Sequence, residues 1–429
     1  MKEKRRIGRR SFLLKTAGAV SALALPRTDF AEKLASGNRS MTRGQEPGED
    51  AYWEMIRSQF LLTDERVYFN NGGLGPSPRR VIDAVHKATL SLEEISETGH
   101  EKLERVREDA AAFLGCDPDE IAFTRSTTEG MNYVARGLDL RAGDEVLMST
   151  HEHPGGAMPW VALKDERGIR IRLFEPARTA EENYDRIARS IGPRTRVLMI
   201  SHMTCTTGTV FPVADLAALC DRKGIFFVLD GAHPPGQMPL NLRDTGAHFY
   251  ATSGHKWLLG PKGTGLLYIR KDMHKQWRPA FVGAYSAEYD LDKLFYSPLK
   301  RASSVEYGTR NIPLVLGLGE AMNFLREIGL ENIRRHNLEL CDILVQNLHE
   351  LPGLRVLTPD EVRSRGSIVT FKPLKLTTQE TIERLAQRGF RLRPVGEHGL
   401  NAIRVSCHVY NNREQVEALA LELRKLFAS

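Results

Sequence analysis

The sequence predicts an α/β protein with a large domain, built on a mostly parallel sheet flanked by helices, and a smaller C-terminal α+β domain. Between residues 67 and 270, short apolar runs alternate with polar turns and amphipathic stretches, a pattern typical of parallel strands joined by crossover helices. After residue 293, two long helical patterns precede short strands and a closing helix. A chain of 429 residues is long enough for two such domains.

The boundaries follow from these changes in pattern. A polar, Gly-rich stretch separates the N-terminal leader from the first globular segment. We predict a signal over 1–25, a linker over 26–50, an N-terminal segment over 51–66 that packs on the small domain, a large domain over 67–310 and a small domain over 311–429.

Five apolar runs of the large domain are predicted strands, and polar residues follow each one directly. Because ligands bind beyond the carboxyl ends of the strands of an open parallel sheet, these polar residues should converge. The predicted strands are 120–123, 145–148, 197–200, 225–229 and 249–251, and the later helices are 313–328, 330–351 and 413–427. The polar groups are Ser126-Thr127-Thr128, His151-Glu152-His153, His202-Met203-Thr204, Asp230-Gly231-Ala232-His233 and Ser253-Gly254-His255-Lys256.

Composition excludes several classes of protein. The five cysteines are far apart and form no C-x-x-C pair, so the sequence predicts neither a zinc knuckle nor a disulfide framework. The net charge of +6 is small and comes partly from the first ten residues, so no nucleic-acid partner is predicted.

The N-terminus resembles a twin-arginine export signal. Arg9-Arg10-Ser11-Phe12-Leu13 leads into a mildly apolar run over 16–25, which is too short for a permanent membrane anchor. We therefore expect a periplasmic or otherwise exported protein. The alternative is a basic tail on a cytoplasmic protein.

Lys256 is the predicted nucleophile. It lies at a strand edge, flanked by Ser253 and His255, and a Gly-rich turn over 260–265 follows. A lysine that is partly desolvated there has a lowered pKa and can form a Schiff base. The turn lacks the G-x-x-x-x-G-K-[ST] order of a nucleotide P-loop.

Asp230 suggests which cofactor the lysine carries. It ends the apolar run 226–229, where a carboxylate needs a cationic partner or strong hydrogen bonds. The protonated pyridine nitrogen of pyridoxal 5′-phosphate (PLP) is such a partner. The alternative is a simple turn residue before Gly231.

Two further groups allow more than one interpretation. Ser126-Thr127-Thr128 opens a helix and suits a phosphate, although a plain helix cap would have the same residues. His151 and His153 could be metal ligands, but the sequence has no H-E-x-x-H motif and no obvious third ligand. An imidazole lying flat on a pyridine ring fits the site better, and no metal is predicted.

At these residues the sequence resembles the class V aminotransferase family of fold-type I PLP enzymes. The resemblance extends from about Val67 to the C-terminus. It is carried by Ser126-Thr127-Thr128-Glu129-Gly130-Met131-Asn132, Glu152-His153, Asp230-Gly231-Ala232-His233, Ser253-Gly254-His255-Lys256 and Tyr307-Gly308-Thr309-Arg310-Asn311.

The resemblance implies roles for the cofactor-binding residues. Lys256 would bind PLP covalently, Asp230 would pair with the pyridine nitrogen and His153 would stack on the ring. Thr309 would reach the phosphate of the neighbouring subunit's cofactor, which implies a homodimer with shared active sites. The residues expected to hold the phosphate within one subunit are Thr128, Ser253 and His255, with Thr127 close by.

The resemblance also implies a substrate end. His233 stands where many members have glutamine, and histidine there is most similar to the isopenicillin N epimerase-like branch. Arg404 would bind the substrate α-carboxylate, a task suited to guanidinium, with Arg393 as a second candidate. His398 and the loop Asn70-Asn71-Gly72-Gly73 are expected to shape the substrate end, with Asn71 as a substrate-binding residue.

One departure bears on the reaction. The stretch 393–400 has no cysteine where similar desulfurases carry their sulfur-accepting nucleophile, and Cys205 is not expected to replace it. We predict an epimerase-like or aminotransferase-like enzyme that acts at the α-carbon of an amino acid or small peptide, with Lys256 removing the α-proton. The alternatives are a C–S lyase or desulfurase-type enzyme, and a protein that binds PLP without turnover.

Overall fold

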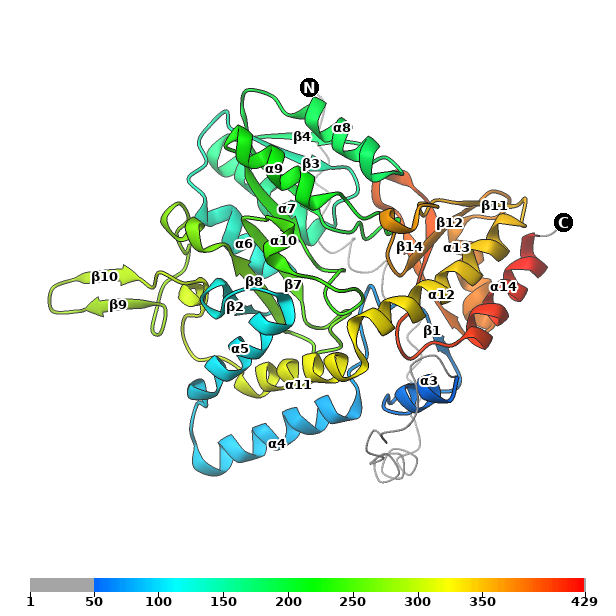
Figure 1. The fold of residues 1–429 in the computed structure, drawn as a ribbon, viewed down its shortest axis with the longest axis horizontal. Coiled ribbons are helices and arrows are strands. Elements are labelled where there is room, and N and C mark those ends of the chain that lie inside the picture. Colours follow the sequence, from blue (N-terminus) through cyan, green and yellow to red (C-terminus); the bar gives the residue numbers. More distant parts are fainter. Residues whose placement is uncertain (1–49, 428–429) are drawn as a thin grey trace, which may run out of the picture. The chain divides into compact units, whose positions relative to one another are not determined.

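The computed structural model describes residues 50–427 (Figure 1). The predicted signal over 1–25 and all but the last residue of the predicted linker lie outside the described residues. Within 50–427, no helix is long and apolar enough to cross a membrane.

A seven-stranded sheet forms the centre of the large domain. Six strands run in the same direction, and β8 alone runs antiparallel to both of its neighbours. Its central strands are buried almost throughout, as expected when helices cover both faces of a parallel sheet. In sheet order the strands are β2 (Ile121–Thr124), β8 (Gly265–Ile269), β7 (Phe249–Ser253), β6 (Phe226–Asp230), β5 (Thr195–Ser201), β3 (Glu145–Ser149) and β4 (Arg170–Phe174).

The helices of this part cover the sheet and bury one stripe each. From α6 and α7, Met131, Val134 and Trp160 enter the same core as Val228 and Phe249 of the sheet. Figure 1 shows α4, α5 and α11 together along one side of the molecule. The helices are α4 (Arg79–Ile95), α5 (Leu103–Leu114), α6 (Thr127–Gly137), α7 (Pro154–Arg167), α8 (Ala180–Ser190), α9 (Val213–Lys223), α10 (Leu242–Thr245) and α11 (Ile312–Ile328).

The C-terminal part is a four-stranded antiparallel sheet packed on helices with a core of its own. Strand β1 (Val67–Tyr68) hydrogen-bonds with β13 (Phe390–Arg391), and on α3 (Asp50–Arg57) the Trp53 ring stacks on His336, 3.8 Å between centroids. The elements are β11 (Leu354–Val356), β12 (Ile368–Pro373), β15 (Ala402–Ser406), β14 (Arg393–Val395), α12 (Leu330–His349), α13 (Thr378–Gln387) and α14 (Arg413–Phe427).

The predicted boundary after residue 310 falls just before α11. This helix packs on α4 and α5, and Gly329, with φ of 88°, separates it from α12. The domain limits themselves stay a prediction.

Hydroxyl groups join the two sheets near the carboxyl end of β5. Thr370 Oγ1 donates to the Thr206 carbonyl at 2.6 Å, and Thr358 Oγ1 donates to the Thr207 carbonyl at 3.0 Å. All four threonines are buried, so the loop after β5 is fixed to the C-terminal sheet.

Two predicted strands begin one residue too early, because Ile225 lies outside β6, which begins at Phe226, and Glu120 lies outside β2. Glu120 belongs to a 3₁₀ turn, because its carboxylate accepts a hydrogen bond from the Asp117 backbone N–H in a capping box. The strand therefore begins at Ile121.

Candidate active site

Polar residues from all five predicted strand ends except His202-Met203-Thr204 line one cavity of about 200 Å³. Strand β5 contributes Ser201, the register partner of Asp230 on β6, and the loop after it contributes Cys205. The C-terminal sheet closes the cavity with one arginine from β14 and one from β15. The predicted site residues in the lining are Thr127, Thr128, His153, Asp230, His233, Ser253, His255, Lys256, Arg393 and Arg404.

Lys256 and Asp230 are the buried charged pair at the base of this cavity. Burial lowers the pKa of the Lys256 amine, and the Asp230 charge acts in the opposite direction. Burial raises the pKa of Asp230, opposed by the charge of Lys256 and by the Ala232 N–H, which donates to Oδ1 at 3.0 Å. Both shifts favour the neutral forms, so Lys256 is a better nucleophile and Asp230 needs a further cation to remain ionised.

Helix α7 comes close to Asp230 at Gly156. A Cβ at Gly156 would lie 2.6 Å from Asp230 Oδ2, closer than side chains tolerate. The backbone can therefore pass beside the carboxylate only because this position has no side chain.

His153 and His233 are both neutral imidazoles. Burial first, and the charge of Lys256 second, lower the pKa of His153 to about 4. The same two causes lower the pKa of His233 well below its usual value. Trp257 Nε1–H donates to His233 Nδ1 at 3.0 Å, so the proton of this ring lies on Nε2, which is buried and has no partner among the described residues.

The N-terminus of α6 forms a cup of hydroxyl and N–H groups. Thr127 N–H donates to Ser253 Oγ at 3.1 Å, and the two hydroxyl oxygens are 2.7 Å apart. His255 Nδ1 is buried beside them without a partner in the described part of the chain. Because free N–H groups and the positive end of the helix dipole meet here, the cup suits a phosphate.

Two arginines face each other across β14 and β15, where Arg393 and Arg404 are register partners. Arg404 Nη1 donates to the Cys205 carbonyl at 2.8 Å and Nη2 to Asn70 Oδ1 at 3.1 Å. Burial lowers the pKa of Arg404 to about 10, which leaves it cationic at neutral pH. Its Nε–H has no partner among residues 50–427, so this edge of the guanidinium is available to a carboxylate.

Arg393 is partly neutralised by an ion pair with Glu397. Burial acts to raise the pKa of Glu397, but the bond from Arg393 prevails and the pKa is lowered. Glu397 is therefore an anion at the substrate end. The loop that follows is unusual, since His398 (φ 45°) and Asn401 (φ 48°) adopt left-handed conformations.

Comparison with known proteins identifies the family of this chain. A family model described as aminotransferase class-V matches residues 67–419. The chain belongs to the class V aminotransferase family. It is 32% identical to isopenicillin N epimerase of Streptomyces clavuligerus over 86% of this chain and 97% of that protein.

Solved structures agree with the class V assignment. The apo structure of a cysteine desulfurase from Thermococcus onnurineus NA1 matches with a TM-score of 0.81 and 27% identity, covering 87% of this chain and 98% of that one. A mutant of C-DES with glycine covalently linked to the PLP cofactor matches with a TM-score of 0.79 and 29% identity, covering 86% and 98%. The predicted fold is confirmed, and so is the prediction that this class V protein is a PLP enzyme.

The residues that line the cavity of this class V enzyme fit PLP, independently of the comparisons. Lys256 offers an amine for the aldehyde, and Asp230 lacks the cation that a protonated pyridine would provide. The buried donor His233 Nε2–H and the buried ring nitrogen His255 Nδ1 have no partner among residues 50–427. The residues that would hold PLP are therefore the ones predicted, although their individual roles stay predictions.

Two predicted site residues lie elsewhere. Asn71 is buried outside the cavity lining, and its Oδ1 accepts from the Tyr410 hydroxyl at 3.0 Å. Thr309 lines a second cavity of about 430 Å³ on the other side of the first turn of α6, together with Arg125 and Arg310. A phosphate contact by Thr309 would thus involve another subunit's site, and it stays a prediction.

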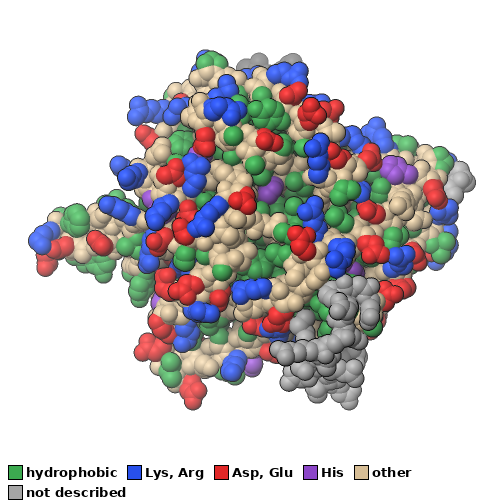
Figure 2. Space-filling model, viewed as in Figure 1, with side chains coloured by type: hydrophobic (Ala, Val, Ile, Leu, Met, Phe, Trp, Pro, Cys, Tyr) green, Lys and Arg blue, Asp and Glu red, His purple; other side chains and the backbone are tan. Residues whose placement is uncertain are grey.

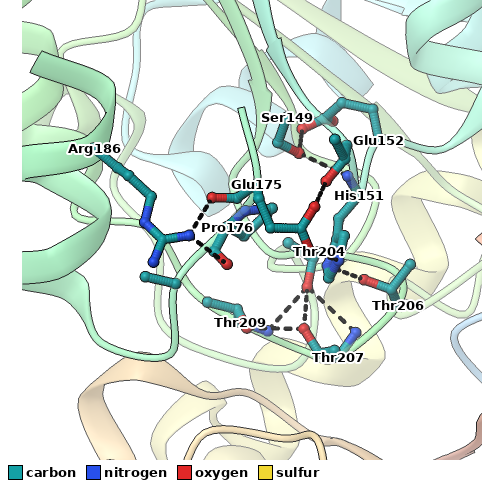
Figure 3. Close-up of polar contacts among 12 residues, drawn as sticks. Ser149, His151, Glu152, Glu175, Pro176, Arg186, Thr204, Thr206, Thr207 and Thr209 are labelled. Atoms are coloured by element: carbon teal, nitrogen blue, oxygen red, sulfur yellow. Dashed lines mark hydrogen bonds and ion pairs between the residues drawn. The ribbon is translucent and has the colours of Figure 1, made fainter. Parts of the chain in front are cut away.

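Glu152 is a buried residue whose part in the site the sequence did not reveal. Its carboxyl oxygens accept from Ser149 Oγ at 2.5 Å and Ser201 Oγ at 2.6 Å, the first of which is drawn in Figure 3. Burial raises the pKa of Glu152 to about 7, and the charge of Asp230 adds to the effect. Its position directly before His153 in the shared motif was the available signal.

The contacts of His151 are not those of a metal ligand. Its Nδ1 is 2.9 Å from Thr206 Oγ1 and its Nε2 is 3.4 Å from Glu175 Oε1 (Figure 3). Within residues 50–427, no three His, Cys, Asp or Glu side chains are grouped so as to hold a metal ion.

Proposed function

We propose that this PLP enzyme acts at the α-carbon of an amino acid or small peptide, as an epimerase-like or aminotransferase-like enzyme. The observation that carries the proposal is the pairing of a desolvated Lys256 with a carboxylate-binding Arg404 in one cavity, beside a loop that contains Glu397 and His398 but no cysteine. Similarity to isopenicillin N epimerase supports the same reaction class.

Bound PLP supplies an electron-withdrawing ring that stabilises negative charge at the substrate α-carbon. Arg404 orients the substrate through its unpartnered Nε–H. Lys256, with its lowered pKa, takes the α-proton onto Nζ. Asp230 would hold a proton on the pyridine nitrogen of bound PLP, and His153, whose pKa burial lowers to about 4, would lie against the ring as a neutral imidazole.

The proposal is tested by the visible absorption of purified protein, wild type beside Lys256→Ala, before and after the addition of PLP and a panel of amino acids. The exposed Lys262→Ala is the matched control. We expect a visible band that shifts with particular amino acids and is lost only in Lys256→Ala, followed by inversion at the α-carbon or formation of a keto acid. A protein that stays colourless with added PLP would overturn the proposal.

The second candidate is a C–S lyase, or desulfurase-type cleavage. Its support is the similarity to the cystine C–S lyase C-DES, at 29% identity and a TM-score of 0.78 over 84% of this chain and 97% of that one. Loss of a β-substituent would begin with the same α-proton transfer to Lys256, after which the Cβ–S bond breaks and the sulfur group leaves with the bonding electron pair. Burial raises the pKa of Cys205 to about 11, which argues against a sulfur-accepting thiolate. Sulfide or pyruvate released from a cysteine derivative, without inversion, would favour this candidate.

We also propose a homodimer. The support is the position of Thr309, which faces a cavity separate from that of its own Lys256. Light scattering on the purified protein should give twice the mass of the chain, and a single-chain mass would refute the proposal.

Finally, we propose export through the twin-arginine route, on the strength of Arg9-Arg10-Ser11-Phe12-Leu13. Fractionation of cells should find the protein outside the cytoplasm, and the double substitution Arg9→Lys with Arg10→Lys should retain it inside. A wild-type protein found only in the cytosol with an intact leader would contradict export.

A further inference from the structure

Glu152 is an acidic side chain in the interior of the large domain. Figure 2 shows acidic side chains scattered over one face of the molecule, including the arm formed by β9 (Ala287–Asp290) and β10 (Phe295–Pro298). Glu152, by contrast, is only 7% exposed. The buried Glu306 accepts from Arg107 at 2.7 and 2.9 Å, whereas Glu152 forms no ion pair within residues 50–427. A negative charge on Glu152 would therefore lack a direct cationic partner there.

Two hydroxyl groups hold the Glu152 carboxyl between neighbouring strands. Ser149 Oγ, at the end of β3, is 2.5 Å from Oε1 (Figure 3). Ser201 Oγ, at the end of β5, is 2.6 Å from Oε2. A carboxylate would accept both bonds, whereas a carboxylic acid would accept one and donate the other, because a serine hydroxyl can do either. These contacts are therefore satisfied equally well by a neutral Glu152.

The segment that begins at Glu152 lies against the carboxylate of Asp230. Ser201 is the register partner of Asp230 across β5 and β6, and a Cβ at Gly156 would lie 2.6 Å from Asp230 Oδ2. The charge of Asp230 adds to the burial that raises the pKa of Glu152 to about 7. Two carboxyl groups in one buried region cannot both ionise without a cost in free energy.

The surroundings of the two carboxyl groups differ in sign. Asp230 is stabilised as an anion by the charge of Lys256 and by the Ala232 N–H, which donates to Oδ1 at 3.0 Å. The protonated pyridine of bound PLP would add a further cation at Asp230. Glu152 is faced by hydroxyls from β3 and β5 and by the negative charge of Asp230 from β6. When neighbouring carboxyls occupy such different environments, one keeps the proton and the other carries the charge.

We propose that Glu152 is a positioning residue that keeps its proton, so that Asp230 carries the single negative charge at this end of the cavity. One anion matches the one proton that a pyridine ring can carry. The two serine bonds also fix the start of α7, because Glu152 directly precedes His153, which caps the helix and lines the cavity. The proposed role depends on the predicted pairing of Asp230 with PLP and is independent of which reaction follows at the α-carbon.

The first test is infrared difference spectroscopy of the PLP-loaded protein as the pH is raised from about 5 to about 9, a range in which exposed carboxyls are mostly ionised. The carbonyl stretch of a protonated carboxyl should be present in the wild type at low pH and absent from Glu152→Gln. In Asp230→Asn it should persist and disappear at a lower pH, because the neighbouring charge is gone. A signal that is lost in Asp230→Asn but kept in Glu152→Gln, or no signal in the wild type, would overturn the proposal.

The second test compares a neutral replacement with a truncation. Glu152→Gln keeps an uncharged group of the same shape, so PLP affinity in a fluorescence titration should stay within about 2-fold of the wild type. Glu152→Ala removes both serine bonds and should weaken PLP binding about 10-fold. A 10-fold loss in Glu152→Gln as well would show that the negative charge is required and would overturn the proposal.

The matched control is Glu145, which joins the same two strands at their amino ends. Its Oε1 accepts from Thr195 Oγ1 at 2.7 Å. Glu145→Gln should change neither the infrared signal nor PLP affinity, and circular dichroism should show that every variant is folded. Loss of the signal in this variant would overturn the assignment to Glu152. A wild type that stays colourless with PLP would overturn the proposed function, whereas a coloured wild type with the proton on Asp230 would overturn the role of Glu152 alone.

Discussion

The two ends of the active-site cavity differ in whether their polar and charged side chains already have partners within the chain. At the cofactor end, His233 Nε2 and His255 Nδ1 are buried without partners among residues 50–427, and within these residues the Asp230 carboxylate accepts only from the Ala232 N–H. At the substrate end the charges already have partners, since Glu397 pairs with Arg393 and Asn70 accepts from Arg404.

This difference separates what the fold determines from what a loop determines. The cofactor end is preorganised by strand ends and the first turns of two helices, and it needs a ligand to complete its hydrogen bonds. At the substrate end, internal groups bind part of each guanidinium, and in the described part of the chain only Arg404 Nε and Arg393 Nη1 keep a buried nitrogen without a partner. The cofactor end is therefore built mainly by the large sheet, whereas the substrate end is built by Arg393 and Arg404 of the C-terminal sheet.

The largest effect is expected at the cofactor end, from Asp230→Asn. The substitution keeps the shape but removes the negative charge that is proposed to hold the pyridine proton, so kcat/KM should fall about 1000-fold, or roughly 4 kcal/mol. Ser201→Ala, which changes the register partner of Asp230 but leaves the carboxylate, should cost far less. A small loss in Asp230→Asn would mean that the carboxylate does not stabilise the reacting ring.

At the substrate end, Arg404→Lys should raise KM about 100-fold with little change in kcat, because an ammonium group cannot reproduce the edge of a guanidinium. Arg393→Lys should raise KM only about 10-fold, because Glu397 already engages Arg393. Steady-state kinetics on both variants distinguishes the two. Equal effects would show that Glu397 moves away when substrate binds.

Two glycine substitutions test how closely the backbone approaches each end of the active-site cavity. Gly156→Ala places a Cβ 2.6 Å from Asp230 Oδ2 and should weaken PLP binding about 10-fold in a fluorescence titration. Gly396→Ala, where a Cβ meets nothing within 4 Å and φ is −101°, should leave PLP binding unchanged. Loss of PLP affinity in the second variant would show that the substrate-end loop also shapes the cofactor site.

The smallest effect concerns Glu152, whose pKa burial raises to about 7. Because the folded protein holds this proton more tightly than the unfolded chain, Glu152 stabilises the fold fully below about pH 4.5 and this contribution is lost as pH rises through 7. Between pH 6 and 8, Glu152→Gln should gain roughly 1–2 kcal/mol of unfolding free energy relative to the wild type. Urea unfolding at both pH values measures this, and a pH-independent difference would contradict it.

Sequence patterns were sufficient to predict which polar groups meet at the cofactor end of the cavity. Polar groups at 126–128, 230–233 and 253–256 follow apolar runs, and the convergence of strand ends brings them into one cavity. The α14 helix was predicted with its observed bounds, because a clear amphipathic period continues to Phe427.

Other features could not be predicted from local pattern. Strand β4 was missed because Arg170 and Arg172 place exposed charges on an edge strand, and β8 because it begins inside a Gly-rich stretch. The pairing of Arg393 with Glu397 depends on a left-handed loop that no periodicity signals. The buried position of Asn71 follows from its contact with Tyr410, 339 residues away.

The threonine contacts between the two sheets constrain how substrate reaches Lys256. Because Thr358 and Thr370 hold the loop that supplies the Cys205 carbonyl to Arg404, swinging the C-terminal sheet away as a rigid body would break buried hydrogen bonds and detach the carboxylate-binding arginine. Arg404 is therefore held in place in the cavity before any substrate arrives.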